Sequence, residues 1–298
     1  MGVTLALCSM LSFGSNILIS RVAMARMSVE HGFFVVLCVN VLFSALVFGI
    51  ESQFRITPFV WHLKEAGYFA LGGFIGTYLG RRLMFDTVRI LGPARASVVH
   101  SVAPAFTLVA AWLLVGEKLG GYELMLTALV IFGLWFTQPT AGGVASEHKP
   151  AGGVLNKGFL IGLATVIGFA LSNVCRGYAM RTWNEAVFGT IIASVAALAC
   201  QLAATRDWGG AARAILAADR KGLVLYAACG VATASGAMFL VSAMHTMEIA
   251  LATLVAHTTP LLIFPVSLLV FKNREGLTLR SAAGAAMVLA GIALLAVR

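Results

Sequence analysis

Long runs of apolar residues, broken by short polar stretches, occupy almost the whole of this chain. Each run has roughly the 20 residues that an α-helix needs to cross the hydrocarbon core of a bilayer. The pattern predicts ten membrane-spanning helices, at about residues 3–20, 32–50, 66–90, 93–116, 121–138, 157–181, 184–204, 221–245, 249–271 and 279–297. We therefore expect an all-α integral membrane protein, with an amphipathic surface turn in the long loop 206–221.

The widest polar interruption runs from Pro139 to Asn156 and is rich in glycine and alanine. Such a composition favours a flexible linker. We place this linker at 141–156, between a first unit, 1–140, and a second unit, 157–298, each with five of the predicted spans.

The two units carry matching residues in the same order. A shift of 156 residues places Gly72, Gly76, Gly80 and Pro104 on Ala228, Ala232, Gly236 and Pro260, and shifts of 157 and 158 place Asn16 on Asn173 and Glu117 on Glu275. The order of the matches favours duplication, although apolar sequences also align by composition alone. Because five spans are an odd number, the second copy is expected to lie inverted, as in alternating-access transporters. The three glycines share one helix face, which predicts close packing against a neighbouring span.

The composition excludes a soluble domain of this length. The chain has 298 residues, of which 60% are hydrophobic and 11% charged, and its mean hydropathy is +0.93. We assign the net charge of +9 to basic residues at the membrane surface and expect no nucleic-acid partner. The five cysteines lie in apolar runs without CxxC spacing, so we expect no disulfide framework, metal or cofactor. The first apolar run is interpreted as the first span rather than as a cleaved signal peptide.

The third predicted span carries charges well inside an apolar helix. A charged residue at membrane depth costs at least about 2.5–3.5 kcal/mol and therefore indicates function. Arg82 and Asp86 are one turn apart and are expected to pair, with Tyr78 on the same stripe. Arg81 points about 100° away, on the side of Thr77. We expect both arginines to line a cavity and to bind a carboxylate or phosphate of the substrate.

Polar residues inside other spans are further candidates for a substrate site. Asn16 lies in the first span, and Ser172, Asn173 and Arg176 lie in the sixth. Such residues either line a cavity or hold neighbouring helices together. For Arg176, which is nearer the end of its span, snorkelling to the interface is an equal alternative.

Two histidines occupy matching places in the fourth and ninth spans. His100 with Ser101, and His257, each lie shortly before a proline that frees a backbone carbonyl at membrane depth. We expect Ser101 and His257 to contact the substrate. Because histidine titrates near neutral pH, His100 is a candidate for proton coupling, and the carboxylate of Asp86 is a second. The simpler alternative is a histidine that is only hydrogen-bonded.

These features together resemble the EamA-type members of the drug/metabolite transporter superfamily. The resemblance rests on the five-plus-five spans and on Pro104, Gly116-Glu117-Lys118, Gly133, Pro260, Glu275 and Gly291. It implies a ten-helix carrier with a central cavity between the first, third, fourth, sixth, eighth and ninth spans. The second unit departs from the family pattern, because two extra residues and no glycine precede Glu275.

The resemblance also implies that both termini lie in the cytoplasm, whereas the basic residues favour the reverse. Five lysines and arginines are expected at the end of the bundle that holds the termini, and thirteen at the opposite end. The more basic side of a membrane protein usually faces the cytoplasm. The two indications conflict.

The sequence contains no Walker loop, GxSxG elbow or HExxH motif, so we expect neither ATP hydrolysis nor another enzymatic activity. The predicted function is secondary transport of a small organic metabolite, anionic or zwitterionic, across the cell membrane by alternating access. Export or exchange is expected, coupled to protons or to a counter-substrate, with membrane lipids as the surroundings and the oligomeric state open. The alternatives are an exporter of cationic drugs, which needs an unpaired membrane carboxylate, and a membrane enzyme acting on lipid.

Overall fold

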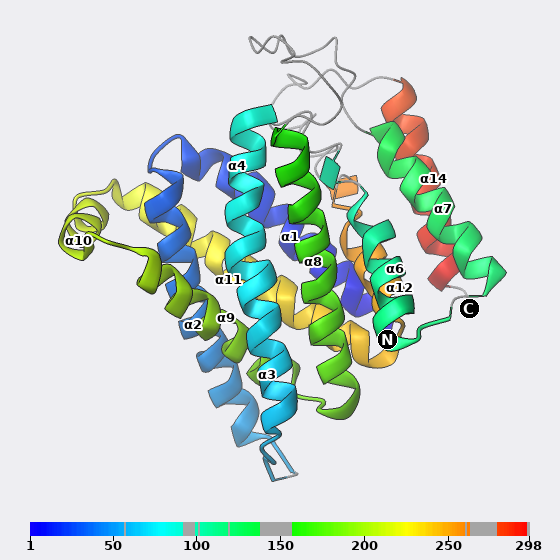
Figure 1. Cartoon of the computed structure of the whole chain (residues 1–298), viewed down its shortest axis with the longest axis horizontal. Helices are drawn as coiled ribbons and strands as arrows, with labels where there is room; N and C mark the ends of the chain where they lie inside the picture. The colour runs from blue at the N-terminus through cyan, green and yellow to red at the C-terminus, as the bar shows by residue number, and fades with distance from the viewer. Residues whose placement is uncertain are drawn as a thin grey trace.

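The computed structural model describes residues 1–56, 58–91, 99–100, 102–118, 120–137, 157–259, 261–262 and 279–296, and the elements in these ranges are helices (Figure 1). The first half contains α1 (Gly2–Met24), α2 (Val29–Gln53), α3 (Leu63–Gly72), the π-helix η1 (Gly73–Gly80), α4 (Arg81–Leu91), α6 (Ala103–Val115) and α7 (Gly121–Thr137). The second half contains α8 (Lys157–Thr182), α9 (Ala186–Ala204), α10 (Trp208–Leu216), α11 (Arg220–Thr246), α12 (Ile249–Ala256) and α14 (Leu279–Ala296). The prediction of an all-helical protein is confirmed for the described residues.

Five of the helices are long and apolar enough to cross a membrane, namely α1, α2, α8, α9 and α11. Shorter apolar helices accompany them, at 103–115, 121–136 and 283–294. The third predicted span is built from α3, η1 and α4, which follow one another without a break. The predicted linker 141–156 lies outside the described residues, and the predicted surface turn contains α10.

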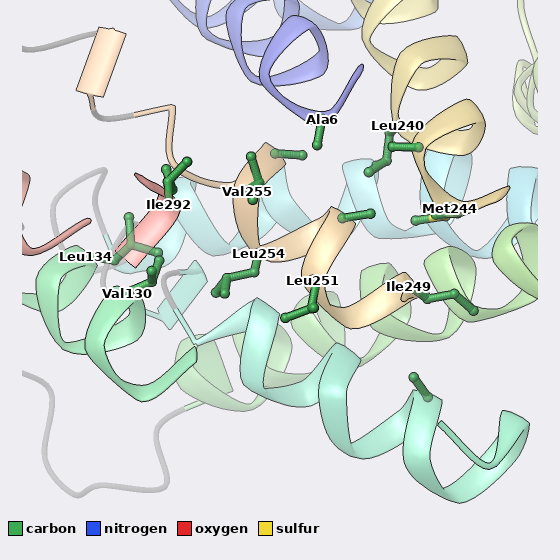
Figure 2. Packing of buried hydrophobic residues seen from close by; sticks show 14 of the residues in the cluster. Ala6, Val130, Leu134, Leu240, Met244, Ile249, Leu251, Leu254, Val255 and Ile292 are labelled. Atoms are coloured by element: carbon green, nitrogen blue, oxygen red, sulfur yellow. The ribbon is translucent and has the colours of Figure 1, made fainter. Parts of the chain in front are cut away.

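The helices pack chiefly on helices of the other half. Helix α1 lies along α11, the segment α3–η1–α4 lies along α8, and α2 lies against α9. Helices α7 and α14 run side by side (Figure 1). The largest apolar cluster draws side chains from both halves, and all eight residues of α12 are buried in or beside it (Figure 2). Neither half therefore buries its apolar side chains by itself.

Glycines sit where helices from the two halves approach most closely, and these contacts come in reciprocal pairs. A Cβ on Gly32 would overlap the Tyr226 ring, and a Cβ on Gly189 would overlap the Phe69 ring. Gly189 follows Gly32 by 157 residues, and Tyr226 follows Phe69 by the same 157 residues. Each contact is thus repeated with the roles of the two halves exchanged.

Two further pairs of glycine contacts are reciprocal between the halves in the same way. A Cβ on Gly133 would lie 2.7 Å from Val288, and a Cβ on Gly291 would lie 2.5 Å from Val130. A Cβ on Gly236 would lie 2.8 Å from the Phe13 ring, and a Cβ on Gly80 would lie 3.1 Å from the Phe169 ring. Gly72 and Gly76 face Arg176 and Ser172 of α8, so the predicted close packing of the Gly72, Gly76 and Gly80 face is confirmed.

Candidate substrate-binding site

The middle of the third span is wound as the π-helix η1, in which Gly73, Gly76 and Gly80 are buried. A Cβ on Gly73 would overlap the backbone of Ala193 in α9, and a Cβ on Gly76 would overlap Ser172 in α8. The glycines therefore allow two helices of the second half to reach the η1 backbone. Longer π-helical segments are rare, and π-helical turns are found frequently at functional sites.

Arg176 of α8 reaches into this segment. It donates hydrogen bonds to the Thr77 hydroxyl at 2.6 Å and to the Gly72 carbonyl at 3.3 Å, and Ser172 donates to the same carbonyl at 2.6 Å. The Nε of Arg176 is buried and has no acceptor among the residues that the structure describes. The side chain is thus held inside the bundle and does not snorkel to the interface.

Arg81 is the first residue of α4. Its guanidinium is 5.9 Å from the ring centroid of Phe33 in α2 and close enough to Arg176 for the two charges to repel each other. Neither arginine forms an ion pair with a carboxylate of the described residues. Two guanidiniums without a counter-ion, one from each half, make this region favourable for an anion.

Arg82 points away from Arg81 and is exposed. It donates to the Tyr78 hydroxyl at 3.3 Å, and no ion pair joins it to Asp86, although both side chains are described. The predicted Arg82–Asp86 pair is therefore wrong. Helical side chains lean towards the N-terminus of their helix, which carries Arg82 back onto Tyr78.

The two predicted asparagines come from α1 and α8. Asn173 is buried beside Ser172, while the backbone carbonyl of Asn16 accepts a hydrogen bond from the Cys229 thiol at 3.8 Å. Cys229 of α11 lies within electrostatic reach of Arg81. Helices α1, α4, α8 and α11 therefore converge around the two arginines.

The two histidines lie close enough to influence each other electrostatically. His257 makes a 2.8 Å hydrogen bond through Nδ1 to the backbone carbonyl four residues earlier. His100 Nε2 is buried and has no hydrogen-bond partner in the described part of the chain. The His100 ring centroid is 6.0 Å from that of Phe169, which also packs on Gly80 of η1. Ser101 lies outside the described residues.

Comparison with known proteins identifies the first half of the chain. Residues 1–138 match the model of the EamA-like transporter family, within the drug/metabolite transporter superfamily. The first half of the chain is therefore similar to EamA-like transporters. A search of curated proteins found no match. A crystal structure described only as that of a protein matches 99% of this chain and 96% of its own, with a TM-score of 0.66 and 15% identity. At that identity the likeness shows the fold alone, and it extends over both halves.

The protein also has contacts between its halves that the sequence alone did not predict. Arg55, after α2, donates two 2.6 Å hydrogen bonds to the carboxylate of Glu185, at the start of α9. The guanidinium lies 5.6 Å from each of the ring centroids of Phe48 and Phe59. The hydrogen bond to Glu185 is the main cause that raises the pKa of Arg55. No local pattern pairs residues this far apart in sequence, so only the fold could reveal the contact.

Thr77 is the other functional candidate that was missed, because a lone threonine in an apolar helix gives no signal of its own. In the structure it accepts the shortest hydrogen bond of Arg176. It thereby links the guanidinium of the second half to the helix that carries Arg81.

Proposed function

We propose that this chain is a secondary carrier that moves a small organic anion or zwitterion across the cell membrane by alternating access. The family consists of transporters, which supports transport as the general activity. We also propose that the chain forms two inverted five-helix repeats, 1–140 and 157–298, joined by the linker 141–156. Export or exchange is proposed, driven by a proton or a counter-substrate, with His100 as the candidate proton site.

The reciprocal glycine contacts support the repeat arrangement. In an inverted repeat related by a two-fold axis, a contact from residue i of one half to residue j of the other recurs with the halves exchanged. The pairs Gly32–Tyr226 and Gly189–Phe69 follow this rule with one offset. These matched contacts favour duplication over chance similarity of apolar sequences.

The proposal of an anionic substrate rests mainly on the proximity of Arg81 and Arg176. Both side chains lie inside the bundle without a carboxylate partner among the described residues. A guanidinium forms strong charge-assisted hydrogen bonds with carboxylate or phosphate. An anionic group of the substrate, held between the two halves, would supply the missing counter-charge. Ser172 and Asn173, with Asn16 and His257, are proposed to contact the rest of the substrate.

The test begins with a thermal-shift screen of the purified protein against anionic, zwitterionic and cationic metabolites. The compound that stabilises the protein most is then followed into vesicles that contain wild-type, Arg81→Gln or Arg176→Gln protein. A hydrogen bond to a charged group contributes about 1.5–3 kcal/mol, so each variant should lose about tenfold or more in the rate of uptake at low substrate concentration.

Arg82 was also expected to bind the substrate, but its side chain is exposed and donates to Tyr78, so the proposal assigns it no substrate contact. Arg82→Gln is therefore the matched control, because it removes the same charge from the neighbouring position. It should retain uptake within about twofold of the wild type, in line with the small effects of most surface substitutions. Wild-type uptake by the Arg81 and Arg176 variants would remove the two-arginine site from the proposal.

One observation favours a second candidate, the exporter of cationic drugs. Asp86 is exposed and has no ion pair in the part of the chain that the structure describes. That candidate predicts stabilisation by cationic compounds only and loss of their transport in Asp86→Asn. The anion carrier predicts the opposite in both measurements.

A further inference from the structure

A short amphipathic helix lies at one end of the bundle and takes no part in the proposed transport site. Helix α10 connects the end of α9 to the start of α11, and none of its nine residues is buried. In Figure 1 it projects from the side of the bundle, at the far left. Its N-terminus is capped by Asp207, whose carboxylate accepts from the Gly210 backbone N–H at 2.8 Å. The helix is therefore a defined element of the fold.

The apolar side chains of α10 divide into two groups. Ile215 packs against the cluster formed by Ala23, Met27, Val36, Tyr226 and Cys229 and so holds the helix to the bundle. Trp208, Ala212 and Leu216, at successive intervals of four residues, form a second stripe that stays exposed. Trp208 is 50% and Leu216 85% exposed. Packing among the described residues leaves this second stripe exposed.

Basic residues flank the exposed stripe. Arg213 follows Ala212 by one position, which places it about 100° around the helix from Ala212, on the side away from Ile215. Arg206 precedes the helix, and Arg220 and Lys221 begin the next span; all four basic side chains are exposed. The two acidic residues of this segment are already engaged: Asp207 caps α10, and Asp219 accepts from Arg26 at 3.0 Å. The Arg26 hydrogen bond is the main cause that lowers the pKa of Asp219.

We propose that α10 is an interfacial helix that binds anionic phospholipid headgroups. Its position between two membrane-spanning helices, α9 and α11, brings it to the level where the bilayer ends. At that level the Trp208–Ala212–Leu216 stripe enters the upper acyl region, and Arg206, Arg213, Arg220 and Lys221 face the phosphate groups. An amphipathic helix with tryptophan and leucine on one side and arginine beside them has the composition of a membrane-surface helix. Charge complementarity selects anionic over neutral lipid.

Trp208 provides a direct measurement of this arrangement that does not depend on transport. Full-length wild-type protein and Trp208→Phe are placed in phosphatidylcholine vesicles, and the difference in fluorescence isolates Trp208 from the four other tryptophans. Lipid with bromine near the top of the acyl chains should quench most of this difference emission, and aqueous iodide should quench little of it. Quenching by iodide alone would place Trp208 in water and overturn the proposal.

The preference for anionic lipid is tested by adding phosphatidylglycerol to the vesicles. The quenching by brominated lipid should increase for the wild type, and the increase should be lost in Arg206→Gln/Arg213→Gln or when salt screens the charges. The matched control is Lys64→Gln/Lys118→Gln, which removes two exposed positive charges from the opposite end of the bundle and should keep the increase. An equal loss in both double variants, or no increase in the wild type, would overturn the anionic-headgroup assignment.

Discussion

Glu117 joins the two halves of the protein through a single buried carboxylate. The side chain, which is 3% exposed, accepts from the backbone N–H groups of Ile249 at 2.8 Å and Ala250 at 3.3 Å, at the start of α12. It also forms an ion pair with Arg181, near the end of α8. The free N–H groups and dipole of a helix N-terminus favour a negative charge. One residue of the first half therefore contacts two helices of the second half.

Removing this carboxylate should destabilise the protein. Glu117→Gln retains an oxygen that can accept from the α12 N–H groups, but it loses the ion pair with Arg181. Because the Arg181 side chain is 39% exposed, solvent weakens this ion pair. We therefore expect the free energy of unfolding to fall by about 1–2 kcal/mol. Glu117→Ala leaves all the donors without a partner and should cost about 3–5 kcal/mol. In detergent, the unfolding temperatures measured by tryptophan fluorescence should decrease in the order wild type, Glu117→Gln, Glu117→Ala.

Glu51→Gln is the control for this series. Glu51 also pairs with an arginine, at 3.3 Å, but its side chain is 44% exposed. Exposed pairs contribute about 0–1 kcal/mol, so the unfolding temperature should change little. A Glu117→Ala variant that unfolds no earlier than Glu51→Gln would contradict the assigned role.

At the scale of the helices, the glycines decide how closely the two halves approach. Gly32 in α2 packs on Tyr226 of α11, and Gly189 in α9 packs on Phe69 of α3. In lipid, small residues stabilise helix pairs because the backbones come closer and gain van der Waals contact. A larger residue at Gly32 would push α2 away from α11, and a larger residue at Gly189 would push α9 away from α3.

Gly32→Ala and Gly189→Ala should therefore each destabilise the protein by about 1–3 kcal/mol through overpacking, and by similar amounts in the two halves. Gly49→Ala is the matched control within α2, because nothing lies within 4 Å of a Cβ there. Alanine has the higher helix propensity, so this control should be as stable as the wild type or more so. Equal unfolding temperatures for Gly32→Ala and Gly49→Ala would exclude the close contact.

At the scale of the whole molecule, the contacts between the halves outweigh the covalent connection. Helix α1 packs mainly on α11 and α7 on α14, while α2 packs on both α11 and α9 and α3 on both α8 and α9. The apolar residues of each half find their partners in the other half, so the halves form one body and not two separate domains.

Cutting the linker should therefore leave the molecule assembled. A protease site introduced within 141–156 and cleaved after purification is expected to give two fragments that co-elute in gel filtration in detergent. Their unfolding temperature should match that of the uncut protein within a few degrees. Separate elution of the fragments would show that the halves hold together mainly through the chain.

Much of this architecture can be predicted from the local sequence. Apolar runs of spanning length predict membrane helices because each span satisfies its own backbone hydrogen bonds. The repeated glycines of the third span predicted its close packing, which the contacts with Ser172 and Phe169 confirm. Helical periodicity also separated Arg81 from Arg82, since neighbouring positions point about 100° apart.

Tertiary structure alone decided which side chains meet. Arg176 was equally compatible with the interface and the interior until α8 placed it beside Thr77. The π-helical turn, the Arg55–Glu185 pair and the partners of Glu117 depend on helices from opposite halves. The periodicity of the sequence indicates which face of its helix a residue occupies, but not which distant helix packs on that face. For this protein the sequence predicted the apolar helices, and only their packing across the two halves decided which of the candidate side chains meet.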